Sequence, residues 1–312
     1  HAYEKSVSKG NRDLQPELTE EIEIGTDLRF YKGRFTLDAA WYDRVTRGLL
    51  WNVPLSSTSG VTSRTSNMGE IQNRGVEIAV NIIPVQKRNF TYSFGLTFAK
   101  NNNTLLELTD GLEKVVINGI SVDGGQQINF VAKPGEPVGV FDARTALRDD
   151  QGRIVVDNQG VPRYADTLID YGTSQYDYMI GWHNILTYKN ITLSFTFDMK
   201  QGGLMYSRTK EISTWAGTTP ATLYNERQPF VVPNSVYEVD QDAAGNPVYA
   251  ENTIPIDEVS LIDYWDKGGE QMDRFFLIDK SYIKLREASV YYSVPSNWLN
   301  KERINNLRIG LT

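Results

Sequence analysis

The stretch Glu21-Ile22-Glu23-Ile24-Gly25-Thr26-Asp27-Leu28-Arg29-Phe30 decides the fold class of this chain. Its apolar and polar residues alternate, so that in an extended strand the apolar side chains share one face. Lys32-Gly33 then forms a short turn, and the alternation resumes from Phe35 to Tyr42. The two runs predict a β-hairpin that is apolar on one side only.

The same alternation recurs and predicts eight strands. Their approximate ranges are 21–31, 35–42, 76–82, 90–99, 176–188, 191–199, 282–294 and 303–312. The connections alternate between short ones, at about 32–33, 84–89, 189–190 and 295–302, and long ones, at about 48–72, 102–175 and 202–280. A compact soluble domain rarely holds loops of such length, whereas outer-membrane barrels combine short periplasmic turns with long extracellular loops. We therefore predict an all-β chain that forms part of a transmembrane antiparallel β-barrel.

The chemistry of the two faces favours a barrel over a soluble β-sandwich or propeller, the alternative that the strand pattern leaves open. Within the first six strands the apolar faces hold no Lys, Arg, Asp or Glu, as a lipid-facing surface requires. Aromatic residues gather near the ends of the runs, as in an interfacial girdle. Two features fit less well. Asn184 falls on an apolar face, and the apolar parity changes between Leu285 and Ala288, which predicts either a β-bulge or a misplaced boundary.

Composition excludes several other classes of function. The chain has 312 residues, 32 Lys and Arg against 39 Asp and Glu, a net charge of −7 and no cysteine. These values argue against a nucleic-acid partner and exclude disulfide scaffolds and thiolate sites. The two histidines, His1 and His183, have no second ligand nearby in sequence, and no catalytic motif is present. We predict no enzymatic activity, no cofactor and no metal site.

Three acidic segments weakly resemble calcium loops: 149–152, 157–160 and 240–246. Each combines Asp with a following Gly, but none has the full EF-hand pattern with its terminal Glu. Polar turns are the favoured interpretation, and calcium binding stays open as the alternative.

The long loops also place aromatic residues among polar ones. Aromatic faces can stack on sugar rings or clamp apolar side chains of a peptide. The candidates for substrate contact in the extracellular loops are Trp215, Tyr224, Phe230 and Tyr206. Loop packing, contact with a lid protein or a place in the aromatic girdle are the alternatives for each of them.

Four motifs, which follow one another along the chain in the same order as in a known family, resemble the motifs of that family. They are Asn11-Arg12-Asp13-Leu14-Gln15-Pro16-Glu17 with Glu23–Phe30, Asn67–Glu77, Pro134-Gly135-Glu136-Pro137-Val138-Gly139, and Lys280–Ser289. Together they resemble the SusC/RagA-like TonB-dependent transporters of the Bacteroidetes outer membrane. Asp142-Ala143-Arg144 departs from the family, in which an aromatic stretch containing Gly is commoner at this point.

The resemblance implies a barrel of about 22 strands around a plug, of which residues 1–312 would be roughly the last third. The chain starts at His1 and stops within a predicted strand, so we expect the plug and the N-terminal strands to lie in a preceding segment. The resemblance further implies import of a large nutrient, an oligosaccharide or a peptide, with a SusD-like surface lipoprotein as a lid. TonB would act through the upstream segment, and two transporter–lipoprotein pairs could assemble as a dimer. A non-transporting barrel that acts as an adhesin or a secretion-complex scaffold is the alternative.

Overall fold

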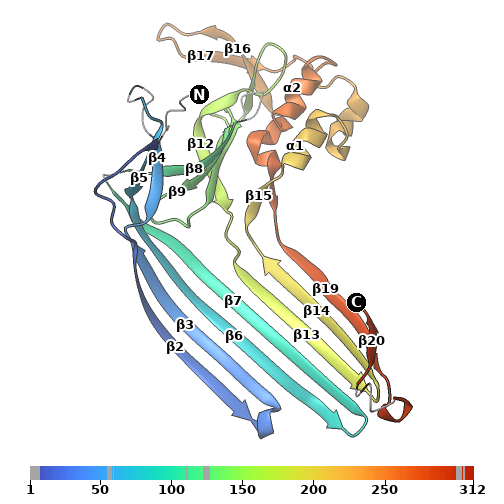
Figure 1. The fold of residues 1–312 in the computed structure, drawn as a ribbon. Helices are drawn as coiled ribbons and strands as arrows, with labels where there is room; N and C mark the ends of the chain where they lie inside the picture. Colours follow the sequence, from blue (N-terminus) through green and yellow to red (C-terminus); the bar gives the residue numbers. More distant parts are fainter. Residues whose placement is uncertain are drawn as a thin grey trace, which may run out of the picture.

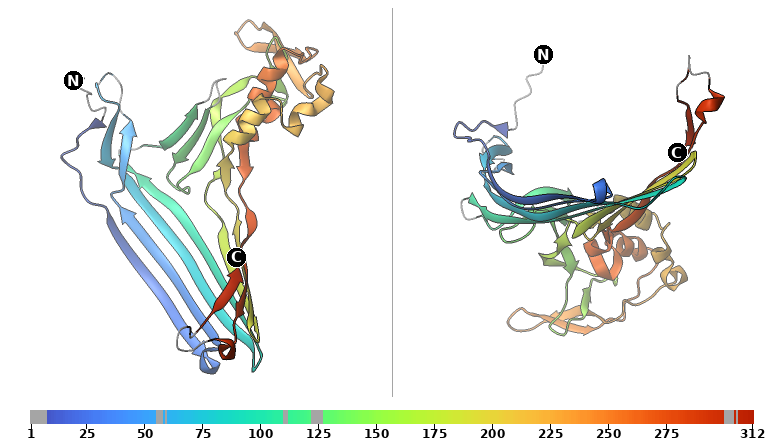
Figure 2. Two further views of the ribbon diagram at one scale, coloured as in Figure 1. Left: turned by 45° about the vertical axis from the view of Figure 1, so that its right-hand side comes forward. Right: turned by 90° about the horizontal axis from the view of Figure 1, so that it is seen from below.

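One large curved sheet dominates the computed structural model, which describes residues 8–54, 58, 60–109, 112–121, 127–299, 304 and 306–312 (Figure 1). Its eight strands are antiparallel neighbours in the order β2-β3-β6-β7-β13-β14-β19-β20. Their bounds are Leu18–Phe30, Phe35–Arg47, Gly69–Lys87, Phe90–Leu108, Tyr178–Tyr188, Ile191–Gln201, Tyr282–Ser293 and Arg308–Leu311. All eight predicted strands are present, in the predicted order, and they form a single-layered arc when seen from below (Figure 2). The all-β prediction is confirmed, and the single layer rules out a sandwich.

The tight turns lie together at one end of the sheet and the long connections at the other (Figure 1). Between β2 and β3 the turn η1 (Tyr31–Gly33) has φ of 51°, 59° and 82° at its three residues. Such left-handed backbone reverses the chain within a few residues, so Phe30 and Phe35 are direct partners in the ladder. The predicted alternation of short and long connections thus gives the sheet one end with tight turns and one end with long loops.

The two irregular positions have structural explanations. The register of β14 against β19 shifts between Thr196 and Phe197, which leaves Arg286 as an extra residue on β19. This is the predicted β-bulge, and it moves the apolar side chains to the other parity. Asn184 is 6% exposed and its Oδ1 accepts a hydrogen bond from the Tyr92 hydroxyl at 2.8 Å. The polar side chain on the apolar face is therefore satisfied by the neighbouring strand.

The long connections fold into smaller units above the sheet (Figure 2). Three of them are sheets, ordered β1-β5-β4, β12-β10-β9-β8 and β11-β16-β17, and β15 pairs with β18. The strand bounds are Ser8–Lys9, Leu50–Pro54, Ser63–Asn67, Val115–Ser121, Gln127–Ala132, Val140–Ala146, Ile154–Val156, Tyr164–Thr173, Leu204–Tyr206, Ser235–Gln241, Pro247–Glu251 and Leu277–Asp279. The helical elements are α1 (Arg208–Trp215), η4 (Pro220–Arg227), α2 (Ser260–Asp266) and η5 (Gly269–Phe276), with η6 (Ser296–Trp298) at the turn end.

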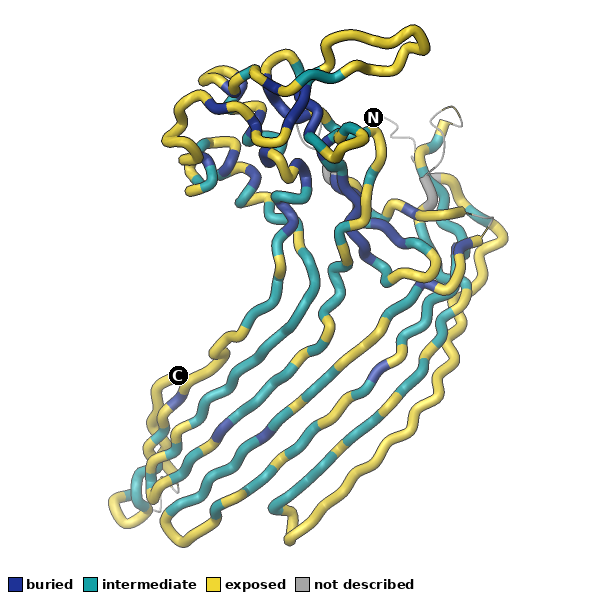
Figure 3. The backbone as a smooth tube through the Cα atoms, turned by 180° about the vertical axis from the view of Figure 1, so that it is seen from behind, coloured by how far each residue is buried: buried dark blue, intermediate teal, exposed yellow. Residues whose placement is uncertain are grey.

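Most of the buried core lies in these loop units, and part of it lies at the loop end of the large sheet, where Leu105 and Leu108 belong to β7 (Figure 3). One cluster joins Ile154, Val161, Ile256 and Met272, and two others surround Leu105 and Ile128. Most residues of the sheet are intermediate or exposed on both faces, and every residue of β2 is exposed. A sheet with one exposed apolar face is suited to lipid on that side. Within the described residues, none of the helices has the length and apolarity needed to cross a membrane.

Candidate functional site

The polar face of the sheet is acidic along β2, β3 and β6. Its charged side chains there are Glu21, Glu23, Asp27, Asp38 and Glu77, with Arg29 and Arg44. Both arginines form ion pairs, Arg44 with Glu21 at 2.7 Å and Arg29 with Asp27 at 3.0 Å. Carboxylates therefore outnumber cations at this end of the face.

The polar face carries an excess of positive charge along β14 and β19, where its carboxylates are Asp198 and Glu287. Lys200 lies near the end of β14, Lys280 precedes β19, and Lys284 and Arg286 lie on β19. Arg286 binds Asp198 at 2.6 Å, and the Tyr282 hydroxyl donates to the same carboxylate at 3.2 Å. The polar face thus has an excess of negative charge along β2, β3 and β6 and an excess of positive charge along β14 and β19. Alternation of polar and apolar residues within strands does not by itself require this difference.

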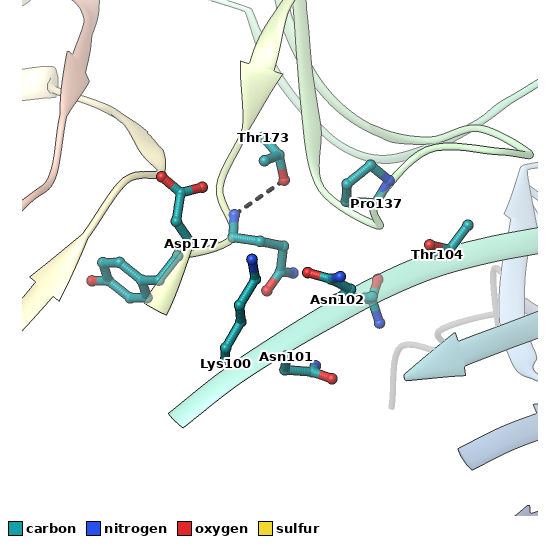
Figure 4. A pocket seen from close by; sticks show the side chains of 10 residues that line it. Lys100, Asn101, Asn102, Thr104, Pro137, Thr173 and Asp177 are labelled. Atoms are coloured by element: carbon teal, nitrogen blue, oxygen red, sulfur yellow. Dashed lines mark hydrogen bonds between the residues drawn. The ribbon is translucent and has the colours of Figure 1, made fainter. Parts of the chain in front are cut away.

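A polar pocket opens where β7 and β13 separate (Figure 4). The two strands pair only as far as Ala99 and Met179, while β7 continues upward alongside β6 as far as Leu108. The space left between them measures about 390 Å³. Its principal polar lining is Lys100, Asn101 and Asn102 from β7 and Gln175, Tyr176 and Asp177 from the segment before β13. Amide, ammonium and carboxylate groups converge there, as in sites that bind polar ligands.

Hydrogen bonds hold the wall of this pocket in place. The backbone N–H of Gln175 donates to Thr173 Oγ1 at 3.0 Å, and its side-chain Nε2 donates to the Val138 carbonyl at 3.0 Å (Figure 4). On the other wall, Asn101 Nδ2 donates to Asn73 Oδ1 at 2.9 Å. The pocket is therefore built by a network that links the sheet to the loop units.

Gly202 and Gly203 approach Asp177 and Lys280 closely. Both have left-handed backbone, with φ of 79° and 80°. A Cβ at Gly202 would lie 2.3 Å from Asp177 Oδ2, and one at Gly203 would lie 2.6 Å from Lys280 Cε. Only glycine allows both the backbone conformation and this close approach, so the pair seats Asp177 and Lys280 beside the pocket.

The four aromatic candidates lie in the loop units but have different surroundings. Trp215 on α1 is 58% exposed and Tyr224 on η4 is 49% exposed. Phe230 is 9% exposed and packs edge-on against Tyr224 and Tyr264, with ring centroids at 4.7 and 5.3 Å. Tyr206 donates its hydroxyl to Glu211. Of the four, Trp215 and Tyr224 present open aromatic surface, and their contact with substrate stays a prediction.

Glu211 on α1 is a buried carboxyl group. Its side chain is 4% exposed and accepts hydrogen bonds from Tyr206 and Arg208. Burial, and next the carboxylates of Asp266 and Asp273, raise its pKa to about 7. The group lies in the core between α1 and the segments that follow, and it does not line the polar pocket.

The three acidic segments form one recurrent turn. In each, one carboxylate oxygen accepts backbone hydrogen bonds from the residues two and four positions later, with Gly in left-handed backbone between them. The Asp residues are Asp149, Asp157 and Asp242. Their oxygens are thus engaged by the backbone, which supports the turn interpretation.

No group of three or more His, Asp or Glu residues within the described part of the chain is arranged to hold a metal ion. His183 lies on the polar face, as predicted, and His1 lies outside the described residues. The polar pocket was not predicted from the sequence. The run Asn101-Asn102-Asn103 and the pair Gly202-Gly203 are the signals that could have indicated it.

Comparison with known proteins agrees with the predicted resemblance. The family described as TonB dependent receptor-like, beta-barrel, matches residues 2–135. TonB-dependent receptor P3 of Formosa agariphila is 24% identical over 320 residues, covering 96% of this chain and 29% of the receptor. TonB-dependent receptor SusC of Bacteroides thetaiotaomicron is 27% identical over 298 residues, covering 92% of this chain and 27% of SusC. The chain thus spans less than a third of the length of these relatives.

A solved structure shares the fold. The structure of the RagAB peptide transporter aligns with a TM-score of 0.67 and 17% identity, covering 97% of this chain and 31% of the matched chain. The resemblance to SusC/RagA-like TonB-dependent transporters is confirmed, as is the barrel fold class. The relatives named here are receptors, and the matched structure is that of a transporter.

Proposed function

We propose that this chain, a relative of the TonB-dependent receptors, forms the C-terminal part of a barrel that imports a large nutrient across the outer membrane. The observation that supports import most directly is the polar pocket at the top of the sheet, beside β7 and β13. A ligand held there would lie between the loop units and the polar face of the barrel wall. The nutrient would be an oligosaccharide or a peptide, because the pocket offers amide and charged groups and the loops offer aromatic surface.

The proposal includes the partners of the transporter. Residues 1–312 would belong to a single barrel domain, with the plug and the other strands supplied by a preceding segment. The edge strands β2 and β20 each have a neighbour on one side only within the described sheet. An unpaired edge is unfavourable in lipid, so pairing with further strands would close the barrel. A SusD-like lipoprotein would cover the loop end, and TonB would transmit energy through the plug. The protein would be located in the outer membrane of a Gram-negative bacterium of the Bacteroidetes type.

Energy-dependent uptake tests this function. Cells that express the whole transporter with its lipoprotein should accumulate its nutrient, and a protonophore or loss of TonB should abolish the accumulation. A co-purifying lipoprotein would support the same assembly. Surface binding without accumulation, unaffected by TonB, would contradict import and favour the adhesin or scaffold alternative. Extraction of the protein without detergent would contradict a membrane barrel.

A further inference from the structure

We propose that Lys200, Lys280 and Tyr176 form a recognition site for an oxyanion, namely a carboxylate carried by the imported ligand. The site lies beside the polar pocket, which Tyr176 lines. It rests on the proposed function in one respect, because it assigns a chemical class to the transported nutrient. The residues come from three separate segments of the chain: the end of β14, the residue after β18 and the segment before β13.

One tyrosine ring positions both ammonium groups. Lys280 Nζ lies 4.1 Å from the centroid of the Tyr176 ring, and Lys200 Nζ lies 4.9 Å from it. Contacts of this kind orient a cation without neutralising it, because the ring contributes a quadrupole and no net charge. Gly203 adds to the positioning, since its missing side chain makes room for the Lys280 stem and its carbonyl accepts from the Lys280 N–H at 3.0 Å.

The two lysines differ from the arginines of the same polar face. Arg29, Arg44 and Arg286 each form an ion pair with a carboxylate on the sheet. Lys200 and Lys280 form no ion pair with any residue that the structure describes, and the same holds for Lys100 in the pocket. Lys200 and Lys280 therefore stand at one tyrosine ring with their charge available, and Lys100 lines the adjoining pocket.

The local charge balance favours an anion. Within the pocket lining Lys100 and Asp177 are the two charged residues, and Lys200 and Lys280 add two positive charges beside it, at Tyr176. Burial and the neighbouring Lys200 lower the pKa of Lys280, so proximity of these positive charges has a cost that a bound anion would remove. The chain as a whole has a net charge of −7, and the opposite end of the polar face is acidic. The positive charge is thus a local feature and not a general property of the surface.

The amides beside the lysines define the rest of the ligand. Asn101, Asn102 and Gln175 line the pocket and can bond to hydroxyl groups of a sugar or to peptide groups. The expected ligand is therefore a polar chain, either a sugar chain or a peptide, that carries an acidic group. Acidic oligosaccharides and acidic peptides are the two sources of such a group, and the experiment separates them.

The experiment uses the whole transporter with its lipoprotein in detergent and two matched pairs of fluorescent probes. One pair is penta-glutamate and penta-glutamine, and the other is an oligogalacturonate and its methyl ester. We expect one anionic probe to bind at least about tenfold more tightly than its neutral counterpart, the effect of a charge-assisted hydrogen bond. The variant Lys200→Gln/Lys280→Gln should reduce that preference to about twofold or less.

The matched control is Lys189→Gln. Lys189 also lies over a tyrosine ring, 5.4 Å from the centroid of Tyr188, but at the turn end of the same sheet. It should leave the preference for the anionic probe unchanged. Heat-modifiable gel mobility of each variant verifies the folded barrel, and the single variant Lys280→Gln replaces the double variant if the latter does not fold.

Absence of a preference for either anionic probe would overturn the site, and so would a preference that survives both substitutions. Failure of the site is distinguishable from failure of the proposed function. Energy-dependent accumulation of a neutral nutrient would refute the oxyanion site and leave import intact, whereas loss of all energy-dependent accumulation would refute import itself.

Discussion

The imidazole of His183 lies directly against the backbone of Gly95 on the neighbouring strand. The two residues are partners in the ladder between β13 and β7, and a Cβ added at Gly95 would lie 1.9 Å from the His183 Cε1 atom. Tyr42 lies against Gly75 in the same way, with its Cζ atom and its hydroxyl oxygen each 2.5 Å from the position of an added Cβ. Rings on the polar face therefore cover glycines on adjacent strands. These contacts pack neighbouring strands against each other in a sheet that has no second layer behind it.

Gly95→Ala should destabilise the barrel. The added methyl group would displace the His183 ring, at a cost of about 1–3 kcal/mol, the usual range for overpacking. The temperature at which heat-modifiable gel mobility is lost should fall relative to wild type. Gly25→Ala is the matched control, because the nearest atom to its added Cβ is the Ala39 carbonyl oxygen at 3.4 Å. An equal loss in both variants would show that the His183 contact is not the cause.

Trp215→Ala should weaken ligand binding and leave the fold unchanged. The side chain is 58% exposed, so its removal deletes aromatic surface without opening a cavity. We expect a loss of affinity of about tenfold, typical of an aromatic anchor. Trp298→Ala, at a side chain that is 70% exposed at the turn end, should have no effect. Unchanged uptake and affinity in Trp215→Ala would exclude this residue from the substrate site.

Phe230→Ala should act on stability instead. The ring is 9% exposed within the core that includes Tyr264 and Ile256. Its removal should cost the loop unit about 3–5 kcal/mol, seen as faster hydrogen exchange in the segments around β16 and α2. The strands of the large sheet should exchange as in wild type. Reduced binding with unchanged exchange would instead identify Phe230 as a ligand contact.

The turn at Asp157 should be independent of calcium. Asp157 Oδ1 accepts from the N–H groups of Gln159 and Val161, at 2.9 and 3.0 Å. Asp157→Ala should therefore destabilise the turn by about 1 kcal/mol, whereas Asp157→Asn keeps an acceptor and should cost less. Hydrogen exchange at residues 157–161 measures both. Slower exchange on addition of calcium, reversed by a chelator, would contradict the turn interpretation.

Glu211 should make the loop unit more stable in mild acid. Its folded-state pKa of about 7 lies above the ordinary value of 4.5, so the folded protein binds more protons than the unfolded chain between these values. The contribution to stability is therefore complete below about pH 4.5 and is lost as the pH rises through 7. Exchange of α1, corrected for intrinsic rates, should be on the order of tenfold faster at pH 8 than at pH 5.

Glu211→Gln removes the titrating group and keeps a similar shape. In this variant the pH dependence of exchange in α1 should disappear, while the dependence in β6 and β7 should match wild type. A pH dependence that persists in Glu211→Gln would assign the effect to other groups, such as Asp266 or Asp273.

The large sheet could be predicted because each of its strands has one apolar face. The smaller sheets gave no such signal. β10 (Val140–Ala146) is buried at Val140, Phe141, Asp142 and Ala143 in succession, and β11 is buried throughout. A strand that is covered on both faces has no reason to alternate. The sequence therefore predicted the long loops by length but not the folded units within them.

What the sequence determined by itself is the set of properties that depend on neighbours along the chain: the eight strands, their two faces, the change of apolar parity between Leu285 and Ala288, and the tight turns. A period of two and a few turn residues are sufficient for these. Only the tertiary structure decided which distant residues meet. Asn184 is satisfied by Tyr92, Phe230 is enclosed by Tyr264, and Lys200, Lys280 and Tyr176 converge from three segments. Such encounters depend on strand order and on where β7 and β13 separate, and no local pattern records either.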